Sequence, residues 1–326
     1  MIAAWRATTS WLAEIAAAWN RFWFRPQAPH ALAAIRVLGG AMLFYTHLVW
    51  TLDLDAFLGA DGWLTEPVVS SVARTPFSWS HLWWLKSSGS LWAGHIAALV
   101  VFALFAAGFW TRATGILSAV LTLSYCHRLQ GALYGLDQVN AMLAIYLAIG
   151  PAGDVYSIDR WRLERWLKYA TPPVRPSVGA AIAIRLIQVH LSIVYLFGGI
   201  SKLKGTMWWD GSAVWYAIAN YEYQTFDMTW LGHWPWLIAI LTHITVFWET
   251  FYPVLVWPRL TRPIMLALAV AVHGGIAVCL GMPTFGLAMI IANLAFVSPE
   301  LIQQWVALPR RWLRRDAAAP AKTSRR

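Results

Sequence analysis

The chain has 326 residues, of which 59% are hydrophobic and only 12% are charged, and its mean hydropathy is +0.53. Soluble domains carry about 25% charged residues, so this composition excludes an ordinary soluble protein and indicates an integral membrane protein. The net charge of +10 does not indicate a nucleic-acid partner, because the basic residues lie in short loops beside apolar segments and in a C-terminal tail, where they orient a membrane protein.

The N-terminal segment, residues 1–28, has the pattern of a helix that lies in the membrane interface. Trp5 and Trp19 fall near helical spacing with other apolar residues, but Glu14 and Arg21 interrupt any long uncharged run. No clear cleavage site follows, which argues against a signal peptide. We expect an interfacial amphipathic helix here, in contact with membrane lipids.

Eight apolar segments follow, and they predict an all-α transmembrane domain over residues 29–300. Several are short, but their composition suits transmembrane helices. They lie at about residues 31–50, 91–110, 112–127, 137–150, 178–201, 235–257, 263–281 and 284–298. Cys126 and Cys279 lie within these segments without CxxC or metal-ligand spacing, so we expect no disulfide and no metal site.

The distribution of basic residues predicts the orientation of these segments. Lysine and arginine concentrate in alternate connections, between Arg160 and Arg175 and from Arg310 onward in particular. By the positive-inside rule, both termini are cytoplasmic in a multi-pass protein of the inner (plasma) membrane, and Lys202 lies at the outer face. The two long outer segments, 51–90 and 203–234, are rich in aromatic residues, Gly and Asp, and we expect them to cap an outward-facing cavity.

Two cytoplasmic segments have the pattern of further interfacial helices. The segment 157–169 mixes basic and aromatic residues, and Ser157 at its start is a good N-cap. The segment 299–315 repeats this pattern. It belongs to a basic cytoplasmic tail, residues 301–326, whose last part we expect to be disordered.

The fifth apolar segment carries a polar stripe that ends at Lys202. Its members recur every three or four residues and therefore share one helical face: Gln188, Ser192, Tyr195, Gly199 and Lys202. Such a stripe in lipid faces protein or a water-filled cavity. The stripe is either a helix contact with Lys202 extended to the headgroups, or the wall of a ligand site in which Gly198 and Gly199 leave room.

The sixth apolar segment places a carboxylate near its middle. Thr242, Thr245, Glu249 and Tyr252 lie on one face. A carboxylate within the membrane is costly unless it is neutral or paired. Glu249 is therefore either the structural partner of an arginine within the spans, Arg185 or Arg36, or a proton relay.

Further polar groups within the spans complete the set of candidates. His273 lies in the seventh apolar segment, and Asp137 and Asn140 open the fourth on one face. Asp137 either caps its helix or works in a site level with Lys202. The remaining histidines in or beside the spans are expected to be satisfied core groups, namely His47, His95, His190 and His243.

Distributed motifs resemble those of a known family, the HTTM (horizontally transferred transmembrane) family, which includes vitamin K-dependent gamma-glutamyl carboxylase. The resemblance covers about residues 30–300 and rests on Arg36, Gly108, Arg112, the Ser157-Ile158-Asp159 run, the Ile193-Val194-Tyr195 run, Gly199, Lys202, Leu203, Gly211 after Trp208 or Trp209, His273, Gly281, Met282 and Phe285.

The resemblance implies a membrane enzyme of lyase or oxidoreductase type in which Lys202 is the general base that deprotonates a quinol similar to reduced vitamin K. Asp137 and His273 would then assist catalysis. The quinol would be held by residues that include Arg36, Gln188, Tyr195, Gly199 and Glu249. A quinone reductase would supply the quinol, and the substrate would be an exported peptide or a lipid.

The sequence departs from the carboxylase in two places. Where the carboxylase has Asn-Asn-His-Ser, residues 133–137 read Leu-Tyr-Gly-Leu-Asp, so the active-site histidine has no counterpart. The resemblance also stops near residue 300, so we expect no lumenal domain to hold a peptide. Two other functions therefore stay open: a non-catalytic maturation or binding factor for an exported peptide, and a transporter, which the lack of internal repeats disfavours.

Overall fold

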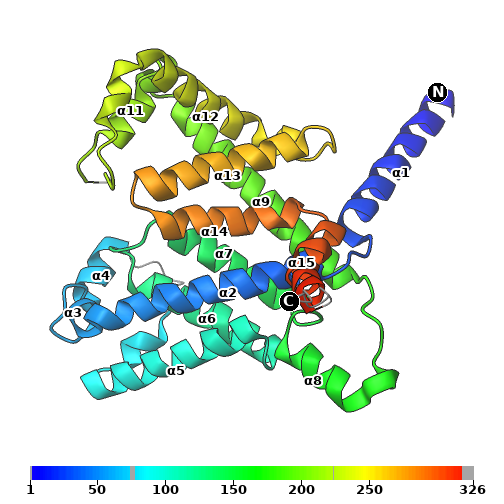
Figure 1. The fold of residues 1–326 in the computed structure, drawn as a ribbon, viewed down its shortest axis with the longest axis horizontal. Helices are drawn as coiled ribbons and strands as arrows, with labels where there is room; N and C mark the ends of the chain where they lie inside the picture. The colour runs from blue at the N-terminus through cyan, green and yellow to red at the C-terminus, as the bar shows by residue number, and fades with distance from the viewer. Residues whose placement is uncertain (1, 74–77, 223, 318–326) are drawn as a thin grey trace, which may run out of the picture.

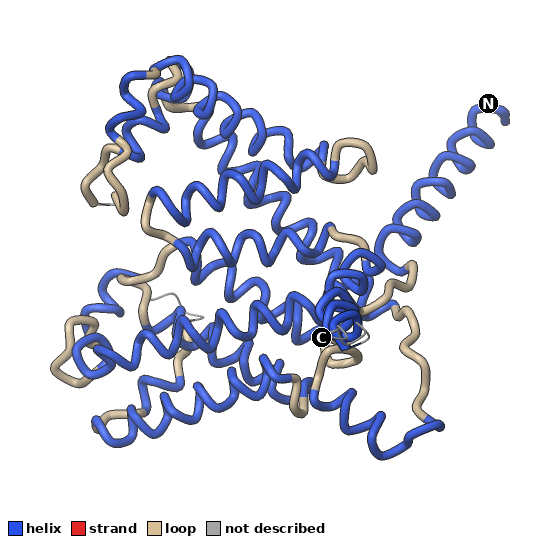
Figure 2. The backbone as a smooth tube through the Cα atoms, viewed as in Figure 1, coloured by secondary structure: helices blue, strands red, loops and turns tan. Residues whose placement is uncertain are grey.

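The computed structural model describes residues 2–73, 78–222 and 224–317, which form a bundle of helices (Figure 1). Within these ranges there is no strand (Figure 2), only an isolated antiparallel bridge between Gln27 and Ser177. The last part of the tail, for which the sequence predicts disorder, falls partly at residues 318–326, outside the described residues.

The α-helices follow the apolar segments of the sequence. They are α1 (Ile2–Phe24), α2 (His30–Trp50), α3 (Leu54–Leu58), α4 (Glu66–Ala73), α5 (Ser88–Ala107), α6 (Thr111–Arg128), α7 (Gly135–Ile149), α8 (Ile158–Leu167), α9 (Val178–Leu203), α10 (Thr206–Trp209), α11 (Ala213–Ile218), α12 (Pro235–Leu255), α13 (Arg262–Cys279), α14 (Pro283–Asn293) and α15 (Pro299–Ala317).

Each of the eight predicted apolar segments coincides with a helix of the bundle, which confirms the all-α prediction. In the described part of the chain, five helical segments are long and apolar enough to cross a membrane: His30–Leu58, α5, α9, α12 and α13. The apolar helices α7 and α14 are shorter. All eight predicted segments are thus helical, but whether all eight cross a membrane, and in which direction, stays a prediction.

The long helices run roughly side by side, so the bundle has two ends (Figure 1). The loop end carries α3, α4 and α11, which belong to the two long connections predicted to share a face. The tail end carries α8, α15 and the junction between α1 and α2. The connections predicted to lie outside and those predicted to lie inside thus occur at opposite ends of the bundle (Figure 1).

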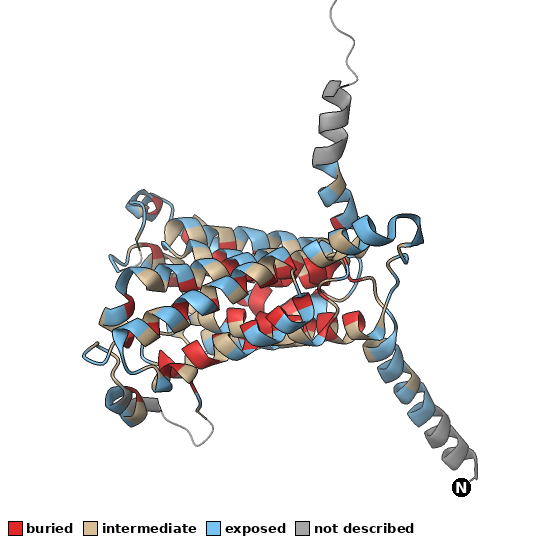
Figure 3. Cartoon of the chain, turned by 90° about the horizontal axis from the view of Figure 1, so that it is seen from below, coloured by how far each residue is buried: buried red, intermediate tan, exposed pale blue. Residues whose placement is uncertain are grey.

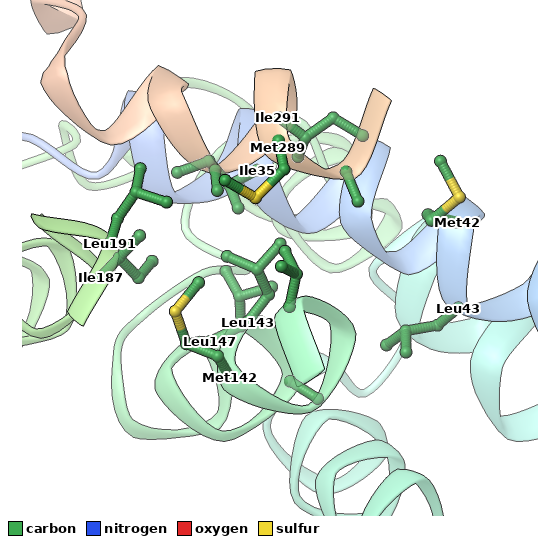
Figure 4. Packing of buried hydrophobic residues seen from close by; sticks show 14 of the residues in the cluster. Ile35, Met42, Leu43, Met142, Leu143, Leu147, Ile187, Leu191, Met289 and Ile291 are labelled. Atoms are coloured by element: carbon green, nitrogen blue, oxygen red, sulfur yellow. The ribbon is translucent and has the colours of Figure 1, made fainter. Parts of the chain in front are cut away.

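The core lies where α2, α7, α9 and α14 meet (Figure 4). Ile35, Leu143, Leu147, Ile187 and Met289 are all nearly inaccessible to solvent. Their methyl-rich side chains interdigitate, and such close packing fixes the positions of neighbouring helices. The core therefore holds α9, the helix that carries Lys202, against the rest of the bundle.

Local signals in the sequence set the helix ends near the tail end. The Ser157 hydroxyl accepts a hydrogen bond from the backbone N–H of Arg160 at 2.9 Å, which confirms the predicted N-cap. Gly108 ends α5 in the left-handed region, with φ at 72°. A side chain there would strike the Arg36 guanidinium, since a Cβ would lie 2.4 Å from its Nη1.

The outer surface of the bundle is apolar, and three amphipathic helices extend away from it. Large hydrophobic side chains are exposed along several long helices, among them Ile193, Phe197, Ile244, Phe247, Phe251, Ile264 and Val270. A soluble monomer rarely exposes so much contiguous apolar surface. Helices α1 and α15 project from the tail end (Figure 3), and α8 lies at the same end, below α15 in the view of Figure 1.

Candidate functional site

An ion pair between α9 and α12 is the centre of the candidate site. Lys202 Nζ donates to Glu249 Oε2 at 2.5 Å. The Lys202 side chain is 26% exposed and that of Glu249 is 10% exposed, so one member reaches the surface and the other is nearly enclosed. The Trp208 ring covers the ammonium from one side, with its centroid 5.4 Å from Nζ.

Two adjacent glycines allow the pair to form. A Cβ on Gly199 would lie 2.6 Å from the backbone nitrogen of Thr250, so the backbones of α9 and α12 could not approach this closely with any larger residue. A Cβ on Gly198 would lie 3.2 Å from Glu249 Oε2. The glycine pair therefore places Lys202 within reach of a carboxylate on the neighbouring helix.

Pro253 further modifies the backbone beside the pair. It lies inside α12, one turn after Glu249. Because proline has no N–H, it cannot donate the helical hydrogen bond to the Glu249 carbonyl. The backbone carbonyl of Glu249 therefore lacks its usual helical N–H donor, and the same residue carries the buried carboxylate.

A second polar group lies among α9, α12, α13 and α14. The Tyr195 hydroxyl is 2.8 Å from His273 Nε2 and accepts from Asn293 Nδ2 at 2.9 Å. The Tyr252 hydroxyl donates to Asn293 Oδ1 at 2.5 Å. The Tyr195 and Tyr252 rings are tilted against each other with centroids 4.1 Å apart, and each meets the Trp248 ring edge to face. We call this set, completed by His273 and Asn293, the tyrosine network.

Two atoms beside the tyrosine network have no hydrogen-bond partner. His273 Nδ1 and Ser192 Oγ are both inaccessible to solvent and unpaired. Buried polar groups are normally satisfied by protein or water, so these two atoms keep hydrogen-bonding capacity that no described residue uses. The Tyr195 ring connects this region to Lys202, two helical turns away on the same face of α9.

The predicted stripe on α9 divides between this site and a structural contact. Tyr195, Gly199 and Lys202 belong to the candidate site as described. Gln188 does not, because its amide accepts from Arg185 Nη1 at 2.8 Å and donates to the Ala295 carbonyl at 2.7 Å. These two bonds satisfy the Gln188 amide in a contact between helices.

Arg36, predicted to hold a cofactor, lies at the tail end and not beside Lys202. Its guanidinium is fully buried and donates to the carbonyls of Phe105, Ala106, Ala152 and Tyr156. Because the guanidinium N–H groups are bound to backbone carbonyls, Arg36 has a structural role in joining these segments. Glu249 pairs with Lys202 and not with Arg36 or Arg185, so the predicted arginine pairing is wrong.

Asp137 lies in the first turn of α7 at the loop end and lines a small cavity whose wall does not include Lys202. Its Oδ2 accepts from the backbone N–H of Tyr134 at 3.0 Å, which is a capping interaction. The α7 start contacts α14, since a Cβ on Gly135 would lie 2.8 Å from the Phe285 ring. Phe285 in turn packs on His273, with centroids 5.9 Å apart. The ring of Phe285 therefore lies between the start of α7, the helix that carries Asp137, and His273 of the tyrosine network.

The histidines predicted to be core groups are all hydrogen-bonded. The partners are the Leu43 carbonyl for His47, Thr51 and Tyr125 for His95, the Tyr146 hydroxyl for His190, and the Ala239 carbonyl for His243. His47 and His95 are also buried, which confirms the prediction of core groups for them, whereas His190 and His243 are hydrogen-bonded but only half-buried.

The first long connection lines two cavities at the loop end. Their volumes are about 320 and 220 Å³, and they share a wall made of Gly59, Ala60, Leu85 and Lys86. Neither cavity has Lys202 or Glu249 in its wall. These two cavities are therefore not the cavity predicted beneath both long connections, which stays a prediction.

Sequence reasoning missed Trp208, Asn293 and Pro253 as parts of the site. In the sequence, Trp208 is typical of a tryptophan that anchors a protein at the membrane interface, and nothing there indicates that its ring lies over Lys202. Asn293 could have been found, because it is a polar residue in an otherwise apolar segment. Pro253 could also have been found from its place one turn after a carboxylate that lies within an apolar segment.

The arrangement offers proton transfer at Lys202 and Glu249, next to hydroxyl and imidazole groups that can orient a ligand. No group of His, Cys, Asp or Glu in the described ranges is arranged to hold a metal ion. Comparison with protein-family models, curated proteins and solved structures finds no match to this chain.

Proposed function

We propose that this chain is a multi-pass membrane enzyme of carboxylase-like, HTTM type that uses the Lys202–Glu249 pair to remove a proton from an acidic hydroxyl. The observation that carries the proposal is the 2.5 Å contact between Lys202 Nζ and Glu249 Oε2 on facing helices. A purely structural lysine at a membrane face needs only water or headgroups. Here it is held against a nearly buried carboxylate.

The pair can produce a basic amine without a large change in charge. Transfer of one proton from Lys202 Nζ to Glu249 Oε2 converts an ammonium and a carboxylate into a neutral amine and a neutral acid. The amine then takes a proton from the bound hydroxyl. The final state holds an ammonium at Lys202, a neutral acid at Glu249 and the substrate anion, so the ammonium lies next to the charge it must stabilise.

The surrounding residues fit a flat, hydroxylated ring such as a quinol. Trp208 offers an aromatic face beside Nζ, and His273 Nδ1 is a polar atom without a partner among the described residues. A bound quinol would supply an ionisable hydroxyl and reducing equivalents. The chain's own contribution is to hold the proton at Nζ and to orient a ring through Tyr195 and His273.

The membrane setting of this proposal has separate support. Within the described ranges, five helical segments are long and apolar enough to span a bilayer, and large apolar side chains are exposed on the outside of the bundle. The predicted orientation puts Lys202 at the outer face of the inner membrane. A quinol dissolved in the bilayer would then reach the pair from the lipid side.

The test uses the full chain in lipid nanodiscs with a reduced naphthoquinone, with oxygen consumption and quinol loss as the two readouts. Lys202→Arg keeps the positive charge but cannot act as a base, so we expect it to lower the rate by about 10²-fold or more. Lys204→Arg is the matched control, because Lys204 lies two residues away, is exposed and belongs to no ion pair in the described structure. It should keep the wild-type rate.

Three outcomes would contradict the proposal. A wild-type rate in Lys202→Arg would show that Lys202 is not the base. The absence of quinol turnover in the correctly inserted wild-type protein would remove the quinol as substrate. Retention of an exported peptide without turnover, unaffected by Lys202→Arg, would identify a binding or maturation factor instead.

A further inference from the structure

The hydrogen bonds of the tyrosine network determine the direction in which each of its protons points. Asn293 Nδ2 donates to the Met289 carbonyl at 2.9 Å, and because a carbonyl only accepts, this contact fixes the orientation of the amide. The same nitrogen donates to the Tyr195 hydroxyl at 2.9 Å, and Asn293 Oδ1 accepts from Tyr252. Both N–H groups of the amide are therefore in use, and Tyr195 accepts one of them.

The bond between Tyr195 and His273 then has one favourable direction. Among the described residues, the one further partner within hydrogen-bond distance of the Tyr195 hydroxyl is His273 Nε2, at 2.8 Å. If Tyr195 donates to Nε2, its single proton is satisfied. If Nε2–H donated to Tyr195 instead, the Tyr195 proton would be buried without an acceptor in the described structure, which is costly. Nε2 is therefore the acceptor.

This direction assigns the proton of the His273 ring. A charged imidazole is costly in a position that is only 3% exposed, and a neutral ring with an accepting Nε2 carries its proton on Nδ1. Nδ1 is inaccessible to solvent and has no partner among the described residues. Because the lone pair of Nε2 is occupied by Tyr195, His273 does not share the role of base with Lys202. What it offers to a ligand is one N–H donor.

The surroundings of this donor favour an occupant with an apolar body over a water molecule. The imidazole meets Trp248 and Phe285 edge to face, with ring centroids 6.0 and 5.9 Å away. The Trp248 indole N–H is already bound to the Met265 carbonyl at 3.1 Å. A buried water typically makes about three hydrogen bonds, and Nδ1 together with the unpaired Ser192 Oγ would provide at most two. Ligand sites typically combine such an aromatic wall with few polar groups.

The amine of Lys202 extends back along α9 toward the tyrosine network. A Cβ on Gly198 would lie 3.8 Å from Nζ, so the amine lies level with Gly198 although its own backbone is four residues further on. Gly198 follows Tyr195 by three residues, which is about one helical turn. The amine and Tyr195 are thus about one turn apart along α9. A flat ring between the amine and the imidazole would present one oxygen to each.

We propose that Tyr195 and Asn293 hold His273 as the Nδ1–H tautomer, and that this N–H donates to the second oxygen of the quinol, the one that Lys202 does not deprotonate. The identity of the ligand rests on the function proposed above, whereas the tautomer does not. His273 then selects a ring that carries an acceptor oxygen opposite its acidic hydroxyl. Tyr195 and Asn293 are positioning residues, because they act on the ligand through the imidazole.

The tautomer can be measured directly by nitrogen NMR of the full chain in lipid nanodiscs, with isotope-labelled histidine. The signals missing from His273→Gln identify His273, and we expect Nδ1 protonated and Nε2 unprotonated. Tyr195→Phe removes the donor to Nε2 and should release this preference. Tyr252→Phe is the matched control and should keep it, because the Met289 carbonyl still orients Asn293. A protonated Nε2 in the wild type, or unchanged signals in Tyr195→Phe, would overturn the assignment.

The ligand contact is tested in the same samples with two probes of similar shape. Oxidised naphthoquinone has two acceptor oxygens and no proton to lose, and dimethylnaphthalene has no oxygen. We expect naphthoquinone to shift the His273 Nδ1–H signal in a saturable way and dimethylnaphthalene to leave it unchanged. No shift with naphthoquinone would overturn the ligand contact and leave water as the occupant of this position. Equal shifts with both probes would overturn the selection for an acceptor oxygen.

Kinetics with reduced naphthoquinone separate ligand binding from proton removal. His273→Phe keeps an aromatic ring but removes the donor, so it should raise KM by about three- to tenfold with little change in kcat. His190→Phe is the matched control, because His190 bonds to Tyr146 outside the tyrosine network, and it should keep the wild-type KM. A fall in kcat as large as that of Lys202→Arg would overturn the proposal. The expected NMR results without any turnover would support the His273 assignment and remove the proposed reaction.

Discussion

Replacement of Arg36 by methionine should strongly destabilise the fold without a specific effect on the Lys202 site. The guanidinium makes four hydrogen bonds, to the carbonyls of Phe105, Ala106, Ala152 and Tyr156. A buried acceptor left without its donor costs about 1–3 kcal/mol. The Phe105 carbonyl keeps the backbone N–H of Gly108 as a donor, so three carbonyls lose theirs. At the lower limit they lose about 3 kcal/mol together, which is a large part of the 5–15 kcal/mol that stabilises a typical protein.

The free energy of unfolding can be followed by tryptophan fluorescence during denaturant titration. Arg36→Lys should lose about half as much as Arg36→Met, because an ammonium has three donors and cannot reproduce the planar fork. Arg112→Met is the control at the same end: Arg112 is exposed, and its one hydrogen bond in the described structure, to the Ile149 carbonyl, is 3.3 Å long. A loss below about 1 kcal/mol in Arg36→Met would refute the assigned role.

Two further predictions concern helix contact and pH. Gly199→Val should separate α9 from α12 and lower the Tm by several degrees. Gly274→Val is the control and should change the Tm little, because no described atom lies within 4 Å of its Cβ position. Equal Tm shifts in the two variants would contradict the close contact at Gly199. For Asp159, burial alone would raise the pKa, but the N–H groups of Thr111 and Trp110 and the Thr111 hydroxyl outweigh it and lower the pKa below the ordinary value. A lowered folded-state pKa stabilises the protein above the unfolded pKa of about 3.9 and loses this effect as the pH falls through the folded value. Asp159→Asn should therefore reduce stability at neutral pH, with a deficit that shrinks below about pH 4 in urea titrations; a pH-independent deficit would contradict this reasoning.

Local features of the fold could be predicted because they depend on neighbouring residues. Apolar runs predict the helices, and Ser157 has the residue type and position of an N-cap. The helical spacing along α9 also places Tyr195, Gly199 and Lys202 on one face. Each of these inferences needs only the period of a helix and the properties of single side chains.

The partners of these residues could not be predicted, because they depend on how distant helices pack. Glu249 had two interpretations in the sequence, the partner of an arginine or a proton relay, and neither named Lys202. The close glycine contact between α9 and α12 places Lys202 beside it. Arg36 had the appearance of a functional charge in an apolar helix. Its carbonyl acceptors come from the last turn of α5 and the segment between α7 and α8, which carry no sequence signal for this role, so only the folded structure identifies them.

The buried guanidinium of Arg36 also has a consequence for biosynthesis. Its four acceptors lie 69 to 120 residues later in the chain. For a chain inserted into the bilayer in the order of its synthesis, the first apolar helix would enter with a charge that has no partner until α5 and the segment after α7 have been made. The first helix would then stay near the translocation machinery until those segments arrive, and release of shortened chains before residue 156 should yield a protein that fails to hold its first span in the membrane.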